Sequence, residues 1–377
     1  MSLKSKLGLK SKGEKVKTNT VDYSLVVIIL MLLCFGLVMV FSASSANAHY
    51  VQGDATFFFR KQLLWALAGI VAMWFVSMFS YTKLKRYANL LFVITIIMLL
   101  LVPFIGVEAN GARRWLGFGS FTFQPSEFVK LTLVLFLARS ITYFPERVQK
   151  LGGGYIRYLL IIGIVAGLVL LQPHMSGSIV VAFAGVAVLY AAGYKMRYFI
   201  ITALGAVPLL IVLAVTSPYR LKRITSFLDP FADKLGESWQ IVQSLYAIGS
   251  GGIFGLGLGQ SRQKFLYIPE PQNDFIFAIV CEELGFVGAV FVIFLFALLI
   301  WKGIMIAKDA PDEFSGLVAT GITSLVAVQV LMNIAVVTSM MPVTGVPLPF
   351  FSYGGSSLMI LLIEMGILLN ISRYVKK

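Results

Sequence analysis

Long apolar segments alternate with short polar connections along most of the chain. A transmembrane helix needs about 20 predominantly apolar residues, and ten segments approach or reach that length. They are residues 24–43, 62–79, 89–106, 126–143, 157–173, 178–193, 198–215, 274–301, 314–337 and 354–371. The pattern predicts an all-α polytopic membrane protein in which residues 21–377 form one membrane domain of ten transmembrane helices.

The composition agrees with a membrane protein. Hydrophobic residues make up 58% of the chain, charged residues only 13%, and the mean hydropathy is +0.88, which lies outside the range of soluble globular domains. Residues 1–20 are polar and basic without a packing pattern, so we expect a disordered tail. The first apolar segment is long enough to remain as a helix, which argues against a cleavable signal peptide. Cys34 and Cys281 lie in apolar runs and predict buried thiols, not a disulfide.

The distribution of basic residues predicts the orientation. An even number of spans places both termini on one side, and most of the 31 Lys and Arg residues would lie on that side, including six lysines of the tail. The positive-inside rule therefore predicts that both termini are cytoplasmic and that the protein is a multi-pass protein of the cell membrane. The long segment 216–273, between the seventh and eighth spans, would then be a large extracellular loop.

A minority of basic residues would lie on the outer side. These are Arg60, Lys61, Arg113, Arg114, Lys130, Arg220, Lys222, Arg223, Lys234, Arg262 and Lys264. Short outer loops usually lack Lys and Arg, so this group predicts an anionic ligand. Binding to the headgroups of membrane lipids is the alternative. We expect no nucleic-acid partner.

Residues 267–288 carry the densest chemistry. Two prolines keep the approach extended, so Asn273 or Asp274 is the expected N-cap of the helix that follows. Asp274 lies at the mouth of this span, and Glu282 and Glu283 lie about two turns further in. Acidic residues inside a span are costly, which favours a functional site. Whether Glu282 and Glu283 are catalytic or structural stays open.

The outer loop has internal organisation. Residues 238–248 have the apolar spacing of a short amphipathic helix at the membrane interface. The segment that follows is rich in glycine. Such a backbone could approach phosphate oxygens, although glycines that simply permit turns explain the same pattern.

Several smaller groups are further candidates. Glu127 and Lys130 follow Pro125 at i, i+3 spacing and form either a functional or a structural ion pair. His174 at a helix end is expected to make hydrogen bonds, and the two histidines and two thiols have no familiar zinc spacing. For Glu364, deep in the last span, catalytic and structural roles are equally open.

Residues 341–357 are rich in prolines and glycines and break the hydrophobic pattern between the last two spans. Irregular backbone at membrane depth is tolerated against protein or a water-filled cavity. We therefore expect this loop to fold back toward the site.

An acid at a helix mouth with basic residues nearby suits attack by a hydroxyl on a carbon that bears a pyrophosphate leaving group. Asp274 would act as general base, and Arg or Lys, with a divalent ion, would neutralise the leaving group. Acids in spans also occur in proton-coupled transporters, so the residues alone leave enzyme and transporter open.

Five sequence motifs favour the enzyme over the transporter, because they resemble those of a known family. They are Pro269-Glu-Pro-Gln-Asn-Asp-Phe-Ile-Phe-Ala-Ile-Val-Cys-Glu-Glu-Leu-Gly, Asn110-Gly-Ala-Arg-Arg-Trp-Leu, Gln124-Pro-Ser-Glu, Gln172-Pro and Leu348-Pro-Phe-Phe-Ser-Tyr-Gly-Gly-Ser-Ser. From about residue 22 to 373 the chain resembles the SEDS family of bacterial shape, elongation, division and sporulation proteins. The resemblance implies a ten-helix bundle with cytoplasmic termini and peptidoglycan glycosyltransfer from lipid II.

Carried over to this chain, the resemblance makes Asp274 the base that acts on the sugar 4-hydroxyl of the acceptor, with release of undecaprenyl pyrophosphate. It further implies Mg²⁺ or Mn²⁺ at an unknown site. The implied substrate-binding residues are Arg113, Arg114, Lys130, Glu127, Glu270, Ser352 and Tyr353. His174 departs from many relatives, which carry an acid there, and this weakens an essential role for a carboxylate at that position.

The motif wording is most similar to the FtsW and spore-cortex branch, and the RodA-type elongation branch stays open. A class B penicillin-binding protein and other division proteins are the implied partners. Two alternatives to the polymerase remain: a lipid II flippase, and a non-catalytic scaffold for the transpeptidase.

Overall fold

The computed structural model describes residues 20–109, 112–118, 121–148, 150–172, 175–215, 227–231, 236, 238–265 and 267–375. Residues 1–19 of the predicted tail (residues 1–20) and His174 lie outside the described residues. The same holds for four of the basic residues expected on the outer side, namely Arg220, Lys222, Arg223 and Lys234.

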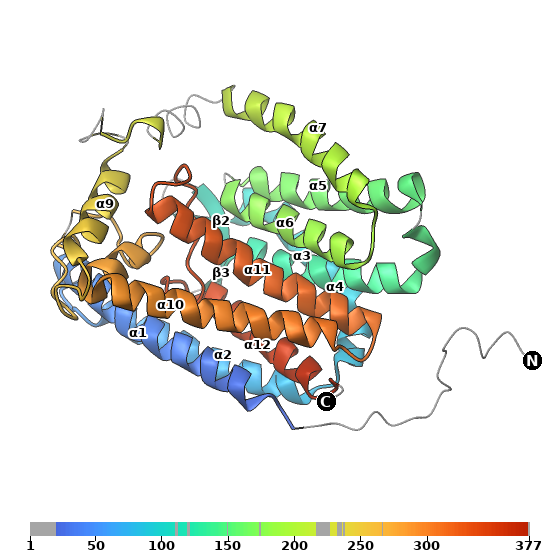
Figure 1. Cartoon of the computed structure of the whole chain (residues 1–377), viewed down its shortest axis with the longest axis horizontal. Coiled ribbons are helices and arrows are strands. Elements are labelled where there is room, and N and C mark those ends of the chain that lie inside the picture. The colour runs from blue at the N-terminus through green and yellow to red at the C-terminus, as the bar shows by residue number, and fades with distance from the viewer. Residues whose placement is uncertain are drawn as a thin grey trace, which may run out of the picture.

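A helix occupies each of the ten predicted apolar segments (Figure 1). These helices are α1 (Tyr23–Gln52), α2 (Phe57–Met78), α3 (Tyr81–Ile105), α4 (Pro125–Tyr143), α5 (Arg157–Leu170), α6 (Met175–Ala191), α7 (Met196–Val215), α10 (Ile276–Lys308), α11 (Glu313–Val337) and α12 (Gly355–Ser372). Within the described residues, seven helical segments are long and apolar enough to cross a membrane, and two more apolar helices are shorter. The chain is therefore a polytopic membrane protein.

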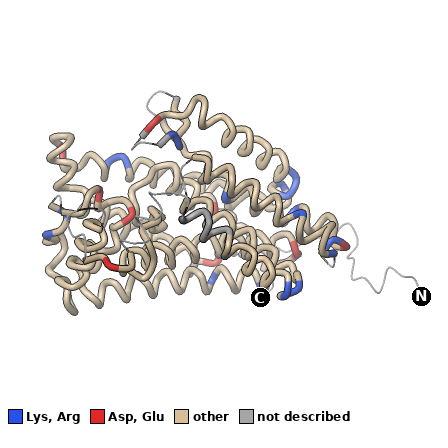
Figure 2. Tube along the Cα trace, turned by 90° about the horizontal axis from the view of Figure 1, so that it is seen from above, with Lys and Arg blue, Asp and Glu red and all other residues tan. Residues whose placement is uncertain are grey.

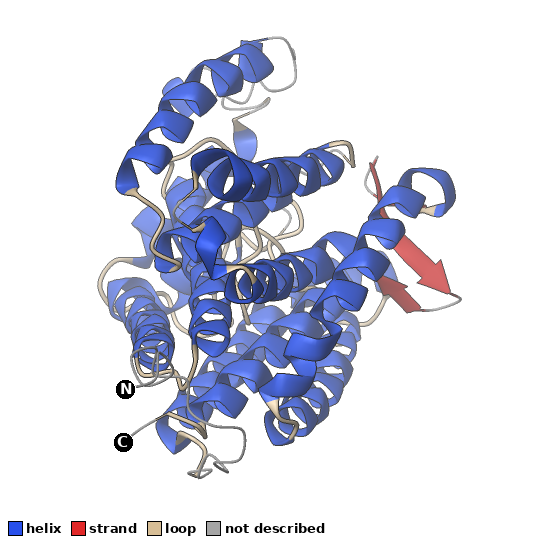
Figure 3. Ribbon diagram, turned by 90° about the vertical axis from the view of Figure 1, so that its right-hand side faces the viewer, coloured by secondary structure: helices blue, strands red, loops and turns tan. Residues whose placement is uncertain are grey.

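The short amphipathic helix predicted in the outer loop is present as α9 (Trp239–Gly251). A small sheet was not predicted. Strands β1 (Val107–Ala109), β2 (Ala112–Phe118) and β3 (Phe121–Phe123) form an antiparallel sheet in the order β1-β2-β3. It connects α3 to α4 and stands at the edge of the helical bundle (Figure 3). A π-helical turn, η3 (Leu151–Ile156), leads into α5.

Helices α11 and α12 form the centre of the bundle. In α12, 78% of the apolar window is buried, against 22% in α3. Helix α12 packs along α2, and α11 packs against α10, α6 and α4. Large apolar side chains such as Leu64 and Trp74 of α2 are exposed, as expected for a helix that faces lipid. Helix α7 lies at the edge, beyond α5 (Figure 1).

Both ends of the described chain lie at one end of the bundle. The amide nitrogen of Asp22 donates to Ser372 Oγ at 3.3 Å, and Lys302 Nζ lies 3.1 Å from Asp22 Oδ2. Lys and Arg gather at this end (Figure 2). Helix α9 lies at the opposite end (Figure 1).

Candidate active site

Asp274 precedes the first turn of α10 and is half-buried. The predicted N-cap at Asn273 or Asp274 was wrong, because α10 begins at Ile276 and the backbone-defined cap is Phe275. Residues 270–275 instead form a turn. The amide of Asn273 donates to the carbonyl oxygen of Glu270 at 3.0 Å, and Asn273 Nδ2 donates to Glu270 Oε2 at 2.8 Å. The side chain of Asn273 is thus used to shape the turn that presents Asp274.

The loop between α11 and α12 folds back onto this turn, as predicted. Ser352 Oγ donates to the carbonyl oxygen of Asn273 at 2.7 Å and accepts from the amide of Leu348 at 2.7 Å. The amide of Tyr353 donates to the carbonyl oxygen of Gln272 at 2.8 Å. Ser352 therefore joins the two segments, and its role in the structure is to hold the loop against Asp274.

Gly345 is the point where the loop faces the acid. A Cβ at this position would lie 3.1 Å from Asp274 Oδ2 and 4.0 Å from Ser176 Oγ. Its φ of 73° is also one that L-residues rarely adopt. Glycine is thus required here both for the backbone conformation and for the close approach of the carboxylate.

Two buried amides that sequence reasoning missed hold this arrangement. Asn333 of α11, which is 1% exposed, donates from Nδ2 to the carbonyl oxygens of Asp274 at 2.7 Å and Val346 at 2.8 Å. Gln62 of α2 donates to the carbonyl oxygen of Ser352 and accepts from the amide of Gly354, both at 3.2 Å. The available signal was a polar amide inside an otherwise apolar span.

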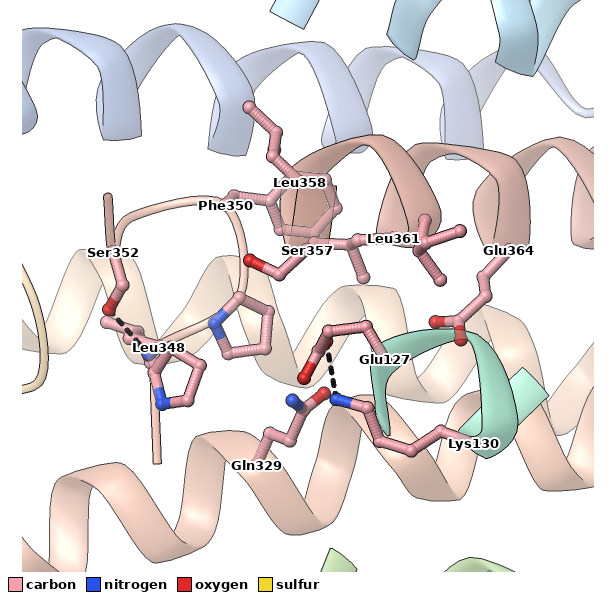
Figure 4. A pocket seen from close by; sticks show the side chains of 13 residues that line it. Glu127, Lys130, Gln329, Leu348, Phe350, Ser352, Ser357, Leu358, Leu361 and Glu364 are labelled. Atoms are coloured by element: carbon pink, nitrogen blue, oxygen red, sulfur yellow. Dashed lines mark hydrogen bonds and ion pairs between the residues drawn. The ribbon is translucent and has the colours of Figure 1, made fainter. Parts of the chain in front are cut away.

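Behind the loop lies the ion pair of Glu127 and Lys130. Lys130 Nζ is 2.7 Å from Glu127 Oε2, and both side chains are buried. They line a cavity of about 30 Å³, into which Gln329 of α11 and Glu364 of α12 also point (Figure 4). Its walls are partly polar, and a cavity of this size can hold about two water molecules. Glu364 therefore faces a cavity that it shares with the polar or charged side chains of Glu127, Lys130 and Gln329.

A second cavity of about 10 Å³ lies beside the ion pair, next to the loop between α11 and α12. Glu127 and Lys130 line it as well, together with Ser176 and Val346. Ser176 and Val346 both lie next to Gly345. Val346 follows Gly345 in the chain, and Ser176 Oγ donates to the carbonyl oxygen of Thr344, which precedes it. The structure thus brings Asp274 and the Glu127–Lys130 pair to two sides of the same loop.

The predicted arginines have different environments on β2. Arg113 is exposed and pairs with Glu108 at 3.5 Å, so its guanidinium is accessible to a ligand. Arg114 Nε donates to the carbonyl oxygen of Gln172 at 3.2 Å, and Gln172 Nε2 donates to that of Leu99 at 3.0 Å. Arg114 therefore ties the sheet to the helical bundle.

Glu270 and Tyr353 flank the same region. Glu270 is exposed and has a φ of 47°. The ring of Tyr353 packs against Phe58 with a centroid distance of 5.0 Å. Burial raises the pKa of Tyr353, so its hydroxyl stays neutral at physiological pH and can act as a hydrogen-bonding group.

Glu282 and Glu283 are structural, which answers the question that the sequence left open. Glu282 accepts from the amide of Arg262 at 2.9 Å and from Ser261 Oγ. Glu283 accepts from Ser42 Oγ at 2.7 Å and pairs with Lys264 at 3.0 Å. Lys264 is 3% exposed, so the expectation that it faces an outer anionic ligand was wrong. These carboxylates fasten the outer loop to α10 and α1.

The described residues offer no cluster of three Asp, Glu, His or Cys side chains that could hold a metal ion. Mg²⁺ commonly keeps several waters and is bound by one or two carboxylates together with substrate phosphates. The residues present therefore fit a cation that arrives with a phosphorylated substrate and meets a carboxylate such as Asp274. They do not form a protein cage for a resident ion.

Fold and site together define an integral membrane protein with a carboxylate at a helix mouth and a buried ion pair on the other side of the loop that faces it. Residues 23–377 match the family model of FtsW, RodA and SpoVE, described as cell cycle proteins. The chain belongs to this family, which confirms the resemblance to SEDS proteins.

Relatives and solved structures agree with the family assignment. Stage V sporulation protein E of Bacillus subtilis is 45% identical over 95% of this chain and 98% of the relative. The "Probable peptidoglycan glycosyltransferase FtsW" of Trichlorobacter lovleyi is 42% identical over 94% of each. A chain from the structure called "Structural coordination of polymerization and crosslinking by a peptidoglycan synthase complex" matches with a TM-score of 0.79 and 31% identity, covering 94% of this chain and 98% of that one. Thermus thermophilus RodA matches with a TM-score of 0.70 and 28% identity over 95% and 98%.

Proposed function

We propose that this protein is a peptidoglycan glycosyltransferase that polymerises lipid II into glycan strands at the bacterial plasma membrane. The observation that carries the proposal is the placement of Asp274 at the loop between α11 and α12. This loop faces the acid through Gly345, and its other side borders the Glu127–Lys130 pair. Several relatives carry the name "Probable peptidoglycan glycosyltransferase FtsW", which supports the same activity.

The depth of Asp274 suits a lipid-linked substrate. Two polar contacts join α1 and α10: Asp22 with Lys302, and Ser42 with Glu283. No charged residue lies between them on either helix. Twenty helical residues span about 30 Å, which is the thickness of the hydrocarbon layer. Asp274 then lies about 10 Å beyond this layer, at the level where a lipid-linked pyrophosphate and its sugar are found.

In the proposed topology all ten helices cross the membrane, both termini are cytoplasmic, and Asp274 and the loop 216–273 are extracellular. The gathering of Lys and Arg at the end of the bundle that carries both termini supports this orientation (Figure 2).

The proposed reaction begins with Asp274 as general base. Its carboxylate takes the proton from the 4-hydroxyl of the acceptor sugar as that oxygen forms a bond to the anomeric carbon of the donor. The bond between this carbon and the pyrophosphate oxygen breaks, and undecaprenyl pyrophosphate leaves with the electron pair. Asp274 then returns its proton to water.

The surrounding residues have distinct proposed roles. Arg113, which is exposed, contacts the pyrophosphate of the donor. Lys130 is buried with Glu127 and shapes the floor of the site. A divalent cation, Mg²⁺ or Mn²⁺, bound by the substrate phosphates and one carboxylate, would neutralise charge on the leaving pyrophosphate. Because this cation would come with the substrate, EDTA is expected to stop polymerisation without lowering the thermal unfolding temperature, Tm, of the substrate-free protein.

We further propose that the protein works with a class B penicillin-binding protein and other division proteins, within the FtsW and spore-cortex branch of the family. The solved neighbour from a synthase complex named for polymerisation and crosslinking supports such a partner.

The test is polymerisation of purified lipid II in proteoliposomes, with Mg²⁺ or Mn²⁺ and a cognate class B transpeptidase. Parent protein and Asp274→Asn are compared at equal amounts of folded protein. We expect long glycan from the parent and none from the variant. Equal polymer from both would remove Asp274 from the chemistry, whereas translocation of lipid II in vesicles without polymer from either protein would favour the flippase.

A further inference from the structure

An exposed apolar segment lies between α9 and the turn that carries Asp274. Within residues 252–258, Phe254 is 81% exposed, Ile253 64% and Leu258 55%. The glycines between them take positive φ values. Exposure of several large apolar side chains on consecutive residues is unfavourable in water, so this segment needs an apolar environment.

The same segment fills a break in α10. Gly285 has φ 65° and ψ −166°, which interrupts the helix. In an unbroken helix, the amides of Phe286 and Val287 would bond the carbonyl oxygens of Glu282 and Glu283. They instead donate to the carbonyl oxygens of Gly252 at 2.9 Å and Ile253 at 3.1 Å.

The loop also donates hydrogen bonds to the carbonyl groups that the break in α10 leaves without a helical partner. The amides of Leu256 and Gly257 donate to the carbonyl oxygens of Glu282 and Glu283, each at 3.0 Å. Because these two amides are bonded to α10, they are not available to bind phosphate oxygens, which was one of the two predictions for this glycine-rich segment. A Cβ at Gly255 would collide with the carbonyl oxygen of Glu283, which explains why the segment is rich in glycine.

The position of the break along α10 gives its depth. Glu283 bonds Ser42 at one boundary of the apolar layer, and Lys302 bonds Asp22 at the other. Gly285 and Val287 lie on the apolar side of Glu283. Residues 252–258, which are bonded to both sides of the break, therefore lie at or just inside the hydrocarbon boundary on the Asp274 side.

We propose that residues 252–258 form a membrane-dipping loop whose apolar side chains contact the acyl chains of the leaflet on the Asp274 side. Irregular backbone within a bilayer requires that its polar groups be bonded by protein, and the four hydrogen bonds to α10 meet this need at the break. The exposed side chains continue the lipid-facing surface of α10, where Phe286 is 67% and Val287 52% exposed. This continuity identifies lipid as the occupant.

Residues 252–258 would thus attach the outer loop to the membrane. The hydrogen bonds and the ion pair of Glu282, Glu283 and Lys264 already attach this loop to α10 and α1. Both attachments belong to the chain segments on either side of the turn that presents Asp274. The proposal does not depend on the glycosyltransferase activity, and its test measures no activity.

The test uses nitroxide spin labels on the full-length protein in proteoliposomes, read by collision with oxygen, which concentrates in lipid, and with a water-soluble nickel chelate. The label is placed at Phe254→Cys in a Cys34→Ala background, where the remaining thiol, Cys281, is buried. Helix α1 supplies two references. The prediction of a buried thiol was wrong for Cys34, which is exposed and lies near the middle of the apolar layer. Gln52→Cys lies ten residues beyond Ser42 in the same helix, on the aqueous side.

We expect the oxygen-to-nickel collision ratio at residue 254 to lie well above that at residue 52 and below that at residue 34. A ratio equal to that at residue 52 would place the loop in water and overturn the proposal. A label at residue 254 that is shielded from both reagents would show that protein, such as a second copy of this chain, covers the loop instead of lipid. Residue 254 is a surface position, so the substitution is expected to leave Tm unchanged, which is checked in parallel.

Discussion

Asn333 Nδ2 lies 2.7 Å from the carbonyl oxygen of Asp274 and 2.8 Å from that of Val346. One amide of α11 thus fixes both the residue that carries the acid and the loop that faces it. Because the bonds go to the main chain, Asn333 positions Asp274 without touching the reacting atoms.

Replacement of Asn333 by Leu is expected to lower kcat by about 10- to 100-fold, since small displacements of a catalytic group are costly. The KM for lipid II should change little, because the substrate-contacting residues are intact. Two buried carbonyl groups lose their donor, so stability should fall by about 2–4 kcal/mol. Polymerisation rates and Tm are measured on the same preparations.

Asn370 offers a matched control for Asn333. It is also 1% exposed, and its Nδ2 donates to the carbonyl oxygens of Ser77 and Phe79, near the end of the bundle that carries the termini. Its Oδ1 also accepts from the amide of Tyr81 at 3.0 Å, so Asn370→Leu should lower Tm by at least as much as Asn333→Leu and leave kcat of the folded protein near the parent value. Equal losses of kcat in the two variants would show that Asn333 has a general structural role and no specific effect on Asp274.

Gly345→Ala tests the close approach of Asp274 to the loop. The new methyl group would lie 3.1 Å from Asp274 Oδ2 and would push the carboxylate aside, so kcat should fall by about tenfold or more. The matched control is Gly53→Ala. Gly53 has a similar φ of 70° but nothing within 4 Å of the added Cβ, so it bears the same backbone strain of about 1 kcal/mol without the contact. If both variants keep full activity, the carboxylate does not need its observed position.

The buried Glu127–Lys130 pair predicts a strong non-additivity. Lys130→Met leaves the Glu127 carboxylate buried without its partner, which is expected to cost about 3–5 kcal/mol. The double variant Glu127→Gln with Lys130→Met should be more stable than Lys130→Met alone. Tm values of the two single variants and the double variant form the cycle, and additive changes would argue against a coupled pair.

The exposed pair of Arg113 and Glu108 supplies the contrast. Surface ion pairs contribute about 0–1 kcal/mol, so Arg113→Met should barely change Tm. If Arg113 contacts the donor pyrophosphate as proposed, this variant should raise the KM for lipid II. An unchanged KM would remove Arg113 from the binding site.

The Asp22 contact at the other boundary of the membrane predicts a pH dependence. Burial alone would raise the pKa of Asp22, but hydrogen bonds from Ser24 and Lys302 outweigh it and hold the pKa below the usual aspartate value of 3.8. A lowered pKa in the folded state means that the contribution to stability is fully present above pH 3.8 and is lost as the pH falls through the lower, folded-state pKa.

The effect is expected to be small, below about 1 kcal/mol, because the pair is partly exposed to solvent. The difference in Tm between parent and Asp22→Asn should therefore be measurable at neutral pH and shrink below pH 3.8. A difference that grows on acidification would contradict the assigned direction of the shift.

The sequence by itself determined where the helices lie and where the chemistry is concentrated. Each of the ten apolar segments is helical, since a segment inside a bilayer must bond its backbone groups internally. The segments could be predicted because length and hydrophobicity are local properties of the sequence. The short helix α9, the return of the loop 341–354 and the importance of the 267–288 region were likewise readable from residue spacing and from prolines and glycines.

Only the tertiary structure decided what individual polar residues do. The sequence left a catalytic role open for Glu282 and predicted ligand binding for Lys264, yet both fasten the outer loop. This could not be predicted, because their bonding partners come from other segments of the chain. Asn333 stood out as a polar residue in an apolar helix, but its bond to the carbonyl oxygen of Asp274 could not be predicted from the sequence. The roles of buried polar groups depend on which segments pack opposite them, and hydrogen-bond partners across a bundle leave no periodic signal in the chain.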